Sequence, residues 1–401
     1  MLHHDVVIVG GGCVGLSVAW HLAKESTMSI AVLEKEHHLA AHQSGRNSGV
    51  LHPGFNYTPG SAKAQFATEG TARLKDYCHQ HQIPCEEFGV MVVAQTPQEV
   101  DRLEDLADQA EANGVAYELL RSEAAIQERE PYASGEAALF APEAASIDSQ
   151  QYVYQLAVDA QAAGVELYTG HEVESISKIA NRYHLVTQGG EHRASYLVNA
   201  AGQYADKIAH QVGVGGGYRI IPFRGEYYEL VPDRTNLCRT MIYPTPDPDL
   251  PFLGVHYTRR TDGKVIVGPN AVLAFGREAY SNRQVNLKEL IRTVTYPGFL
   301  RLIASWDMMS VALDELHKSY RKRRFVAASQ RLVPDVMSED LRKSYSGIRA
   351  QLVDESGQLV KQPMSIETSN GIHVLNAVSP GLTSSLPYGE HIANKLVGMA
   401  D

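Results

Sequence analysis

The feature that most constrains this chain is a glycine fingerprint within its first 34 residues. A short apolar run, residues 5–9, ends in Gly10-x-Gly12-x-x-Gly15, and a helical pattern continues from there to Lys24. A second apolar run, residues 30–33, ends at Glu34. Strand, helix and strand of these lengths predict a βαβ unit, whose parallel strands are buried in a sheet.

Each glycine of this fingerprint has a physical role in holding a dinucleotide. Gly10 permits a tight turn, Gly12 lets the backbone approach a diphosphate, and Gly15 lets the helix pack closely on the strand. Cys13 and Val14 lie in the first helical turn, where backbone amides and the positive end of the helix dipole attract an anion. The fingerprint therefore predicts a dinucleotide-binding unit.

Glu34 narrows the choice of dinucleotide. Its carboxylate can accept hydrogen bonds from a ribose diol, and its charge repels a 2′-phosphate, so NADP is disfavoured. The alternative is a glycine-rich turn without a ligand, which the combination of strand, helix and acid disfavours. The glycines at 213–217 follow no apolar strand and are predicted to form a turn, so a single dinucleotide is expected.

Two further segments favour FAD over NAD. The loop at residues 42–52 is polar and glycine-bearing, and it can line a long cofactor. The segment Asn199-Ala-Ala-Gly202 ends a predicted strand and resembles the Ala-Thr-Gly segment of flavoproteins with two dinucleotide domains. Predicted cofactor contacts besides the fingerprint are Lys35, Ser44, Arg46, Asn47, Ser48, Gly49, Val173, Ala200, Ala201 and Gly202.

Length and composition limit the remaining possibilities. A chain of 401 residues favours two packed domains, and a net charge of −10 argues against a nucleic-acid partner. The four cysteines form no Cys-x-x-Cys pair, so no metal site is predicted and a reducing, cytoplasmic location is expected. The uncharged run at residues 6–20 is too short and too glycine-rich for a membrane anchor.

The pattern changes along the chain and predicts a mixed α/β (α+β) fold with discontinuous domains. From about residue 218, short apolar runs alternate with Pro and Gly turns, as in antiparallel sheets, and residues 286–341 have a helical pattern. We predict a Rossmann-type FAD-binding domain and an antiparallel-sheet substrate domain. The predicted bounds are 1–80, 145–217 and 330–401 for the first domain, and 81–144 and 218–329 for the second.

Several multi-residue segments occur in the order found in a known family. They include Asn47-Ser-Gly-Val-Leu-His-Pro-Gly54, Pro222-Phe-Arg-Gly-Glu-Tyr227, Tyr243-Pro-Thr-Pro-Asp-Pro248 and Pro251-Phe-Leu-Gly-Val-His256. With them the chain resembles the FAD-dependent oxidoreductases of the D-amino-acid oxidase type and, among these, the L-2-hydroxyglutarate oxidase/dehydrogenase group. Residues 281–344 match more loosely, and Val378 stands in place of the family's first proline in Pro-Ser-Pro.

The resemblance implies oxidation of L-2-hydroxyglutarate to 2-oxoglutarate by hydride transfer to non-covalently held FAD. Electrons would then pass to a quinone, another acceptor or oxygen. A quinone acceptor would require peripheral contact with the inner membrane, for which the basic stretch at 318–324 is one candidate. A solvated helix face is the alternative for that stretch.

Hydride leaves the substrate more readily if a base removes the hydroxyl proton, which favours histidine. His256 and His52 are the two candidates, and His52 also corresponds to a loop where some relatives attach FAD covalently. Arg349 matches a carboxylate-binding arginine of relatives. Further substrate contacts are predicted at Arg224, Tyr243 and Tyr257, with salt bridges or ordinary packing as alternatives; flavin contacts near the C-terminus are predicted at Pro380, Gly381, Thr383 and Ser384.

Two other functions remain open from the sequence. An amino-acid oxidase or dehydrogenase of the same fold is the nearest alternative, although an amine loses its proton to water and needs no placed base. A flavoprotein subunit without turnover is the other.

Overall fold

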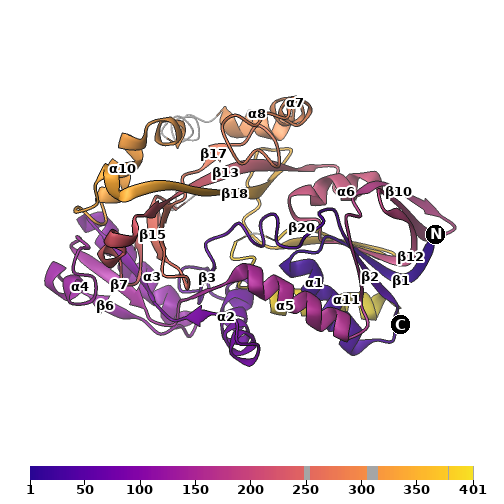
Figure 1. Ribbon diagram of the computed structural model, residues 1–401, viewed down its shortest axis with the longest axis horizontal. Coiled ribbons are helices and arrows are strands. Elements are labelled where there is room, and N and C mark those ends of the chain that lie inside the picture. The colour runs from indigo at the N-terminus through magenta and orange to yellow at the C-terminus, as the bar shows by residue number, and fades with distance from the viewer. Residues whose placement is uncertain (248–252, 305–314, 378, 401) are drawn as a thin grey trace.

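The computed structural model describes residues 1–247, 253–304, 315–377 and 379–400 (Figure 1). One sheet has eight strands in the order β10-β11-β12-β1-β2-β9, with β20 beside β12 and β19 beside β20. Their bounds are β1 (Leu2–Val9), β2 (Ile30–Glu34), β9 (Glu166–Thr169), β10 (Val173–Ile179), β11 (Arg182–Thr187), β12 (Gly190–Asn199), β19 (Met364–Thr368) and β20 (Gly371–Asn376).

The predicted βαβ unit is confirmed at the centre of this sheet. β1 and β2 are parallel, with Val6 opposite Ile30, and α1 (Cys13–Glu25) connects them. β12 pairs in parallel with the other edge of β1. Alternate side chains of β1 are buried on opposite faces: Val6 and Ile8 belong to one apolar cluster, Val7 and Val9 to another. Burial on both faces explains why the strand reads as an uninterrupted apolar run.

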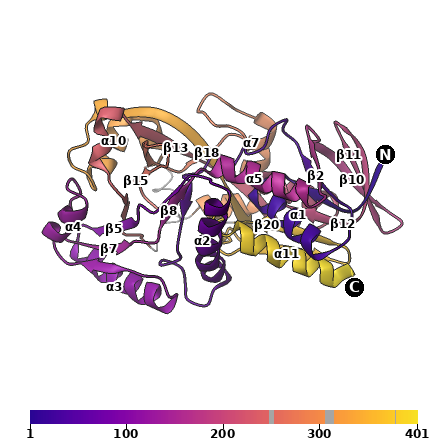
Figure 2. The same ribbon diagram turned by 60° about the horizontal axis from the view of Figure 1, so that its bottom comes forward.

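Helices cover one face of the parallel sheet. α1, α5 (Ser149–Ala162) and α11 (Ser385–Ala400) lie side by side there in both views (Figures 1 and 2). α2 (Ala62–Gln80) packs against α11, and α6 (Ala205–Gln211) lies near β10 and β20. The fully buried Leu16 and Leu22 of α1 anchor this layer.

A second sheet has nine strands and is mostly antiparallel. The order is β17-β13-β16-β15-β14-β5-β7-β6, with β18 along the other edge of β13. The bounds are β5 (Val90–Ala94), β6 (Glu118–Leu120), β7 (Ala137–Ala141), β13 (Tyr218–Leu230), β14 (Met241–Pro244), β15 (His256–Arg259), β16 (Val265–Gly268), β17 (Val272–Leu273) and β18 (Leu341–Asp354). β14 and β5 form a parallel pair within it.

The predicted fold class is confirmed, with one change in detail. Two of the short apolar runs expected after residue 218, one near Ile220 and one after Glu226, are not separate strands, because both belong to the thirteen-residue β13. β18 pairs with almost the whole of β13 and continues toward the parallel sheet, where it contacts β20. The division into the two predicted domains stays a prediction, since residues 330–401 contribute to both large sheets.

The remaining elements are short or lie at the periphery. β3 (Val50–Leu51), β4 (Cys85–Glu86) and β8 (Ala145–Ile147) form a small third sheet. The other helices are α3 (Pro97–Ala112), α4 (Glu123–Arg129), α7 (Leu287–Val294), α8 (Pro297–Ile303), α10 (Lys322–Gln330), η1 (Gly202–Tyr204), η2 (Pro232–Leu237) and η3 (Ser338–Asp340). Among the described helices, none has the length and apolar character required to cross a bilayer.

Candidate active site

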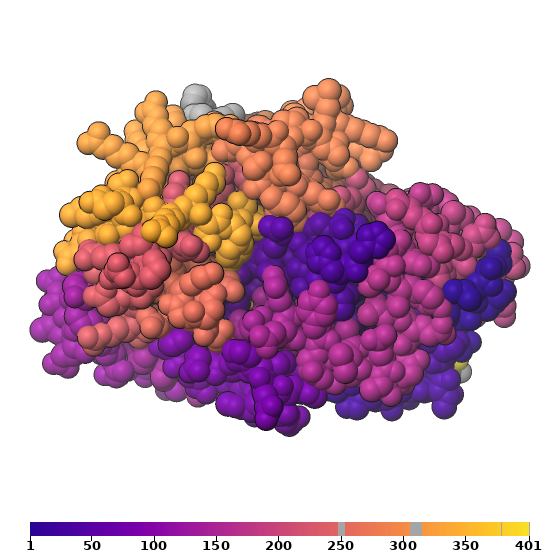
Figure 3. All heavy atoms as spheres, in the orientation of Figure 1, coloured from indigo at the N-terminus to yellow at the C-terminus, as the bar shows by residue number. Residues whose placement is uncertain are grey.

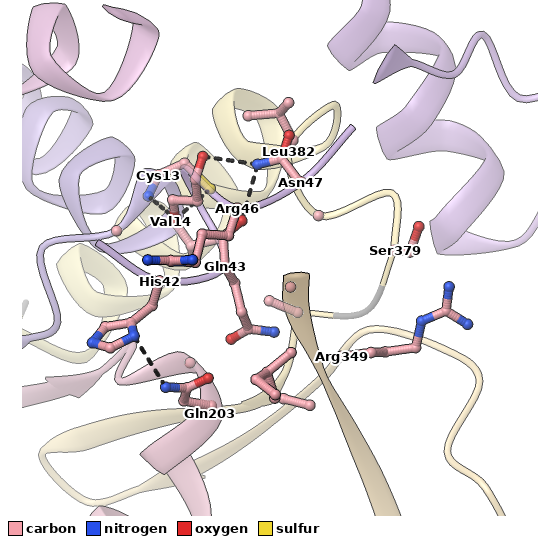
Figure 4. Close-up of a pocket in the computed structure, with 18 of the residues that line it drawn as sticks. Cys13, Val14, His42, Gln43, Arg46, Asn47, Gln203, Arg349, Ser379 and Leu382 are labelled. Atoms are coloured by element: carbon pink, nitrogen blue, oxygen red, sulfur yellow. Dashed lines mark hydrogen bonds between the residues drawn. The ribbon is translucent and has the colours of Figure 1, made fainter. Parts of the chain in front are cut away.

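One continuous cavity of about 760 Å³ connects the glycine turn to the predicted catalytic residues. At one end its wall contains Gly10, Gly12 and Glu34, and at the other it contains His52, His256 and Arg349. Figure 4 shows Cys13 and His42 on the opposite side of the cavity from Arg349 and Ser379. The sequence-distant segments therefore enclose a single elongated site.

The glycine turn has no room for side chains. Gly10 has a φ of +111°, and a Cβ there would lie 2.4 Å from the Ala200 carbonyl oxygen. A Cβ on Gly15 would lie 2.0 Å from the Gly10 carbonyl oxygen. The close approach of α1 to β1 and to the residue after β12 thus depends on both glycines, as predicted.

Replacement of Gly15 by alanine is expected to lower the free energy of unfolding by about 1–3 kcal/mol, because the methyl group overpacks the turn. The purified variant should also retain less FAD, measured as flavin absorbance per protein. Gly398→Ala in α11 is the matched control: a Cβ there meets nothing within 4 Å, so stability and FAD content should not fall. Equal FAD retention in both variants would contradict this role of Gly15.

The residues at the glycine turn fit a cofactor with a central diphosphate. α1 begins at Cys13, its N-cap Gly12 provides no side-chain cap, and its first turn contains no acid. Buried amide oxygens of Asn56 and Gln203 line the same cavity, without a hydrogen-bond partner in the described part of the chain. The positive end of a helix dipole favours phosphate, and orphaned acceptors favour a ligand with donor groups.

Glu34 ends the second strand, at the position expected for the ribose-binding acid. One oxygen of its carboxylate accepts from the Gly11 amide at 2.9 Å and the other from the Glu36 amide at 2.9 Å. These bonds fix the carboxylate at the wall of the cavity. Lys35 also lines the wall, but its ammonium pairs with Glu36 and, at 2.7 Å, with Glu278. Lys35, which directly follows β2, therefore links this strand to the segment that contains Glu278. It also faces the cavity.

The loop at 42–49 is folded by its own hydrogen bonds against the cavity. The Asn47 side chain donates to the Gln43 and Ser44 carbonyls and accepts from the Gly49 amide at 2.8 Å (Figure 4). The Ser44 hydroxyl accepts from the Cys13 amide at 3.1 Å. The Arg46 guanidinium donates to the Ala41 carbonyl and lies over the Tyr280 ring.

Most predicted cofactor residues line the cavity. These are Gly10, Gly12, Cys13, Val14, Glu34, Lys35, Ser44, Arg46, Asn47, Ser48, Val173, Ala200, Ala201, Gly202, Pro380, Gly381 and Thr383. Gly15, Gly49 and Ser384 do not line the cavity, contrary to the cofactor contacts predicted for them. The Thr383 hydroxyl accepts from the His52 amide at 3.2 Å, which ties the C-terminal segment to the loop after the second strand.

Two histidines and a tyrosine meet at the far end of the cavity. The ring centroids of Tyr243 and His256 lie 4.3 Å apart, and those of Tyr243 and His52 lie 6.0 Å apart. Nδ1 of His256 lies 2.8 Å from the Gly254 carbonyl oxygen, which can only accept. Nδ1 of the neutral ring therefore carries the hydrogen, and Nε2 keeps a lone pair.

Both histidines are neutral in this enclosure. Burial lowers the pKa of His52 to about 4, with added repulsion from His256 and Lys63. Burial also lowers the pKa of His256 to about 4; the Gly254 hydrogen bond opposes this shift and the Arg349 charge adds to it. A neutral imidazole can accept a proton at neutral pH.

Positive charges lie beside these rings. Arg349, from β18, and Lys63, from the first turn of α2, both line the cavity with Lys361. Burial and the charges of Arg349 and Lys361 lower the pKa of Lys63 to about 8. The Lys63 ammonium lies 4.6 Å from the centre of the Tyr57 ring. Clustered cations next to a neutral base suit an anionic substrate.

Arg224 and Tyr257 lie outside the cavity, contrary to the roles predicted for them. Along β13, the cavity-lining residues are Phe223, Gly225 and Tyr227, so Arg224 points to the other side of the sheet. There its guanidinium pairs with Glu226 at 3.3 Å and also bonds Asn282. The Tyr257 hydroxyl donates to the buried Ser329 carbonyl at 3.0 Å.

Lys63, Tyr57 and Tyr227 line the cavity without having been predicted from the sequence. Tyr227 ends the family-like segment Pro222–Tyr227, and Lys63 lies in the first turn of α2, where its ammonium interacts with the charge of Arg349 from β18. The alternation of side chains along β13 predicts which of its residues share a face. If Gly225 lies at the cavity, then Phe223 and Tyr227, two positions away on either side, face the cavity as well.

Fold and site together define a dinucleotide-dependent oxidoreductase, in which a Rossmann-type sheet and a second sheet enclose one cavity. The family described as FAD dependent oxidoreductase matches residues 5–395, and the chain belongs to this family. FAD is therefore the cofactor of this enzyme.

Relatives extend the comparison over nearly the full length. The chain is 38% identical to an L-2-hydroxyglutarate dehydrogenase of Escherichia coli (strain UMN026), covering 98% of this chain and 93% of the relative. It is 39% identical to an L-2-hydroxyglutarate dehydrogenase of Indibacter alkaliphilus, covering 96% of both chains. Among solved structures, the FAD-bound L-alpha-glycerophosphate oxidase of Mycoplasma pneumoniae aligns with a TM-score of 0.75 at 23% identity, covering 100% of this chain and 95% of the other.

Proposed function

We propose that this enzyme oxidises L-2-hydroxyglutarate to 2-oxoglutarate with FAD. The observation that carries the proposal is the convergence of Arg349, Lys63 and the neutral His256 on one end of the FAD cavity. Two separate cations match the two carboxylates of this substrate, and the neutral imidazole matches its hydroxyl group. The substrate named for the relatives agrees with this chemistry.

Arg349 and Lys63 divide the two carboxylates in this proposal. Arg349 binds the carboxylate next to the reacting carbon, because a planar guanidinium holds a carboxylate with two parallel hydrogen bonds and so fixes its orientation. Lys63 binds the distal carboxylate as a compact charge, with the exposed Lys361 at the same wall. Because both groups are charged, they disfavour a substrate orientation that would place an apolar group beside them.

His256 removes the hydroxyl proton. Its Nε2 carries the lone pair, since Nδ1 donates to the Gly254 carbonyl, and the same bond keeps the ring from turning. Binding of the dianionic substrate raises the proton affinity of the ring, because a nearby negative charge favours the imidazolium. Bound FAD supplies the acceptor for the hydride from C2. Tyr243 packs against both histidine rings and limits their motion.

The pH dependence of kcat/KM follows from these charges. Lys63 is charged below its pKa of about 8, so kcat/KM for L-2-hydroxyglutarate should fall as the pH rises through this value. At the acid side, kcat/KM should fall as the pH approaches about 4 and the histidines become protonated.

The variant Lys63→Met removes the group responsible for the alkaline limb. It should raise KM for L-2-hydroxyglutarate by about 10-fold or more, the loss of a charged hydrogen bond, and abolish the fall above the Lys63 pKa. Turnover of a 2-hydroxy monocarboxylate should change little. The matched control is Lys288→Met, an exposed lysine of α7. An unchanged alkaline limb in Lys63→Met would exclude Lys63 from the distal carboxylate site.

A panel of acids assayed with a dye acceptor tests the proposed reaction. We expect turnover of L-2-hydroxyglutarate to exceed that of 2-hydroxy monocarboxylates and of amino acids, including glutamate. Preferred turnover of glutamate would instead identify an amino-acid oxidase or dehydrogenase of the same family. Absence of turnover with every acid, in protein that contains FAD, would favour a flavoprotein subunit without its own substrate.

We further propose that FAD is held without a covalent bond and passes electrons to a quinone or other acceptor, or to oxygen. His52 packs against Tyr243 at the substrate end, which supports a role in shaping the pocket rather than in attachment. Acid precipitation of the protein should release all flavin into the supernatant. Flavin that remains with the precipitated protein would indicate a covalent link.

A further inference from the structure

The segment between β17 and α7 leaves the second sheet and reaches the cofactor-binding half of the protein. β17 pairs with β13 in the second sheet, whereas residues that follow β17 bond to segments after β2 and β12 of the first sheet. We call this segment, residues 274–286, the strap. In Figure 3, orange atoms of this part of the chain lie directly above indigo atoms of the N-terminal part. None of the strap residues lines the cavity, so the strap forms an outer layer.

The Glu278 carboxylate of the strap joins the two sides of the cofactor end of the cavity. One of its oxygens lies 2.7 Å from the Lys35 ammonium and accepts from the Tyr204 hydroxyl, also at 2.7 Å. Lys35 follows β2, Tyr204 follows β12, and both residues line the cavity. β2 and β12 flank β1, which leads into the glycine turn. A single side chain of the strap therefore bridges the sheet edge on both sides of that turn.

The Tyr280 side chain of the strap holds the loop at 42–49. Its hydroxyl lies 2.6 Å from Nδ1 of His42, and the Arg46 guanidinium lies 4.3 Å from the centre of its ring. Nε2 of His42 lies 2.8 Å from the Glu36 carboxylate, which can only accept, so Nδ1 of the neutral ring keeps the lone pair. The Tyr280 hydroxyl therefore donates to His42. Since His42 and Arg46 line the cavity (Figure 4), the strap holds this part of the wall from outside.

The strap combines a buried anchor with contacts that water can reach. The Arg277 guanidinium forms two hydrogen bonds with the Asp206 carboxylate of α6, and these side chains are only 5% and 2% exposed. The side chains of Glu278 and Lys35 are 39% and 21% exposed. An ion pair that water can reach opens at lower cost than a buried one. The strap therefore has a fixed anchor at Arg277 and outer contacts, through Glu278 and Tyr280, that can open.

We propose that the strap controls how fast FAD enters and leaves the enzyme. While Glu278 and Tyr280 are in contact, the loop at 42–49 and the turn after β12 are held together around the cofactor end of the cavity. When these contacts open, the loop is released and the cofactor can pass. The contacts join protein groups only, so they hold the strap closed with or without FAD. Opening of the strap therefore limits entry as well as release.

Dilution of the FAD-loaded enzyme, followed by flavin fluorescence, tests this role. The time course gives the dissociation rate constant, the end points give Kd, and the two together give the association rate constant. Glu278→Gln should raise the dissociation rate constant about 10-fold, the contribution of a partly exposed charged hydrogen bond. Tyr280→Phe should raise it about 3- to 10-fold, since it removes one neutral hydrogen bond. The association rate constant should rise as well, so Kd should change less than either rate.

Glu367→Gln is the matched control, because it removes an ion pair of similar length and exposure. The Glu367 carboxylate lies 2.6 Å from the Lys395 ammonium, and these side chains are 45% and 33% exposed. The pair joins β19 to α11, and neither residue lines the cavity. Both rate constants of the control should equal those of the wild type.

Two results would overturn the proposal. The first is a dissociation rate constant in Glu278→Gln and Tyr280→Phe that equals that of Glu367→Gln. The second is faster dissociation with an unchanged association rate constant, because the strap would then only support the bound cofactor and would not limit its passage. The measurement requires no substrate, so its outcome is independent of the proposed oxidation of L-2-hydroxyglutarate.

Discussion

Replacement of His256 by alanine is expected to lower kcat for L-2-hydroxyglutarate by about 10²- to 10⁴-fold, the usual contribution of a positioned base. Nε2 of His256 is the proposed proton acceptor, and alanine leaves none in its place. FAD content should be unchanged, because the glycine turn and the loop at 42–49 lie at the other end of the cavity. Steady-state kinetics with a dye acceptor and the flavin absorbance per protein are the two measurements.

Two further variants distinguish catalysis by His256 from a general effect of losing a histidine. His79→Ala removes an exposed imidazole of α2 and should leave kcat unchanged. His52→Ala should lower kcat less than His256→Ala does, if His52 shapes the pocket without accepting the proton. A larger loss in His52→Ala, with His256→Ala nearly normal, would transfer the role of base to His52.

Replacement of Arg349 by alanine is expected to lower kcat/KM by about 10²- to 10⁴-fold, because leaving an enclosed substrate carboxylate without its cationic partner costs about 3–5 kcal/mol. Both kcat and KM should be affected, because the guanidinium orients the substrate as well as binding it. FAD should remain bound.

Arg349→Lys separates charge from geometry. Lysine keeps the positive charge but cannot form the two parallel hydrogen bonds, so we expect it to recover only part of the lost activity. Arg323→Ala, an exposed arginine of α10, is the control and should behave as the wild type. Normal kcat/KM in Arg349→Ala would remove Arg349 from the substrate site.

The cofactor-binding half could be predicted from sequence because its determinants are local. Gly10, Gly15 and Glu34 lie within one strand–helix–strand unit, so the spacing along the chain also sets their spacing in space. The contacts near Thr383 were also predicted, but from family resemblance, since nothing local connects that segment to His52.

The positions of the substrate-binding residues depend on which face of each strand meets the cavity, and the sequence pattern does not determine that face. Arg224 and Tyr243 were equally plausible from sequence, but β13 turns Arg224 toward Glu226 and β14 turns Tyr243 toward the histidines. A shift of one position reverses every side chain of a strand. Lys63 reaches the site from a helix of another layer, and only tertiary packing places its charge near Arg349.

We propose that FAD and a 2-hydroxy dicarboxylate occupy one cavity next to each other, and anaerobic reduction of the flavin tests this arrangement most directly. Mixing the purified enzyme with L-2-hydroxyglutarate, without any other acceptor, should bleach the visible flavin absorbance within a turnover and release 2-oxoglutarate in equal amount. The D enantiomer should leave the absorbance unchanged over the same time. Flavin that stays oxidised with the L enantiomer would contradict the account.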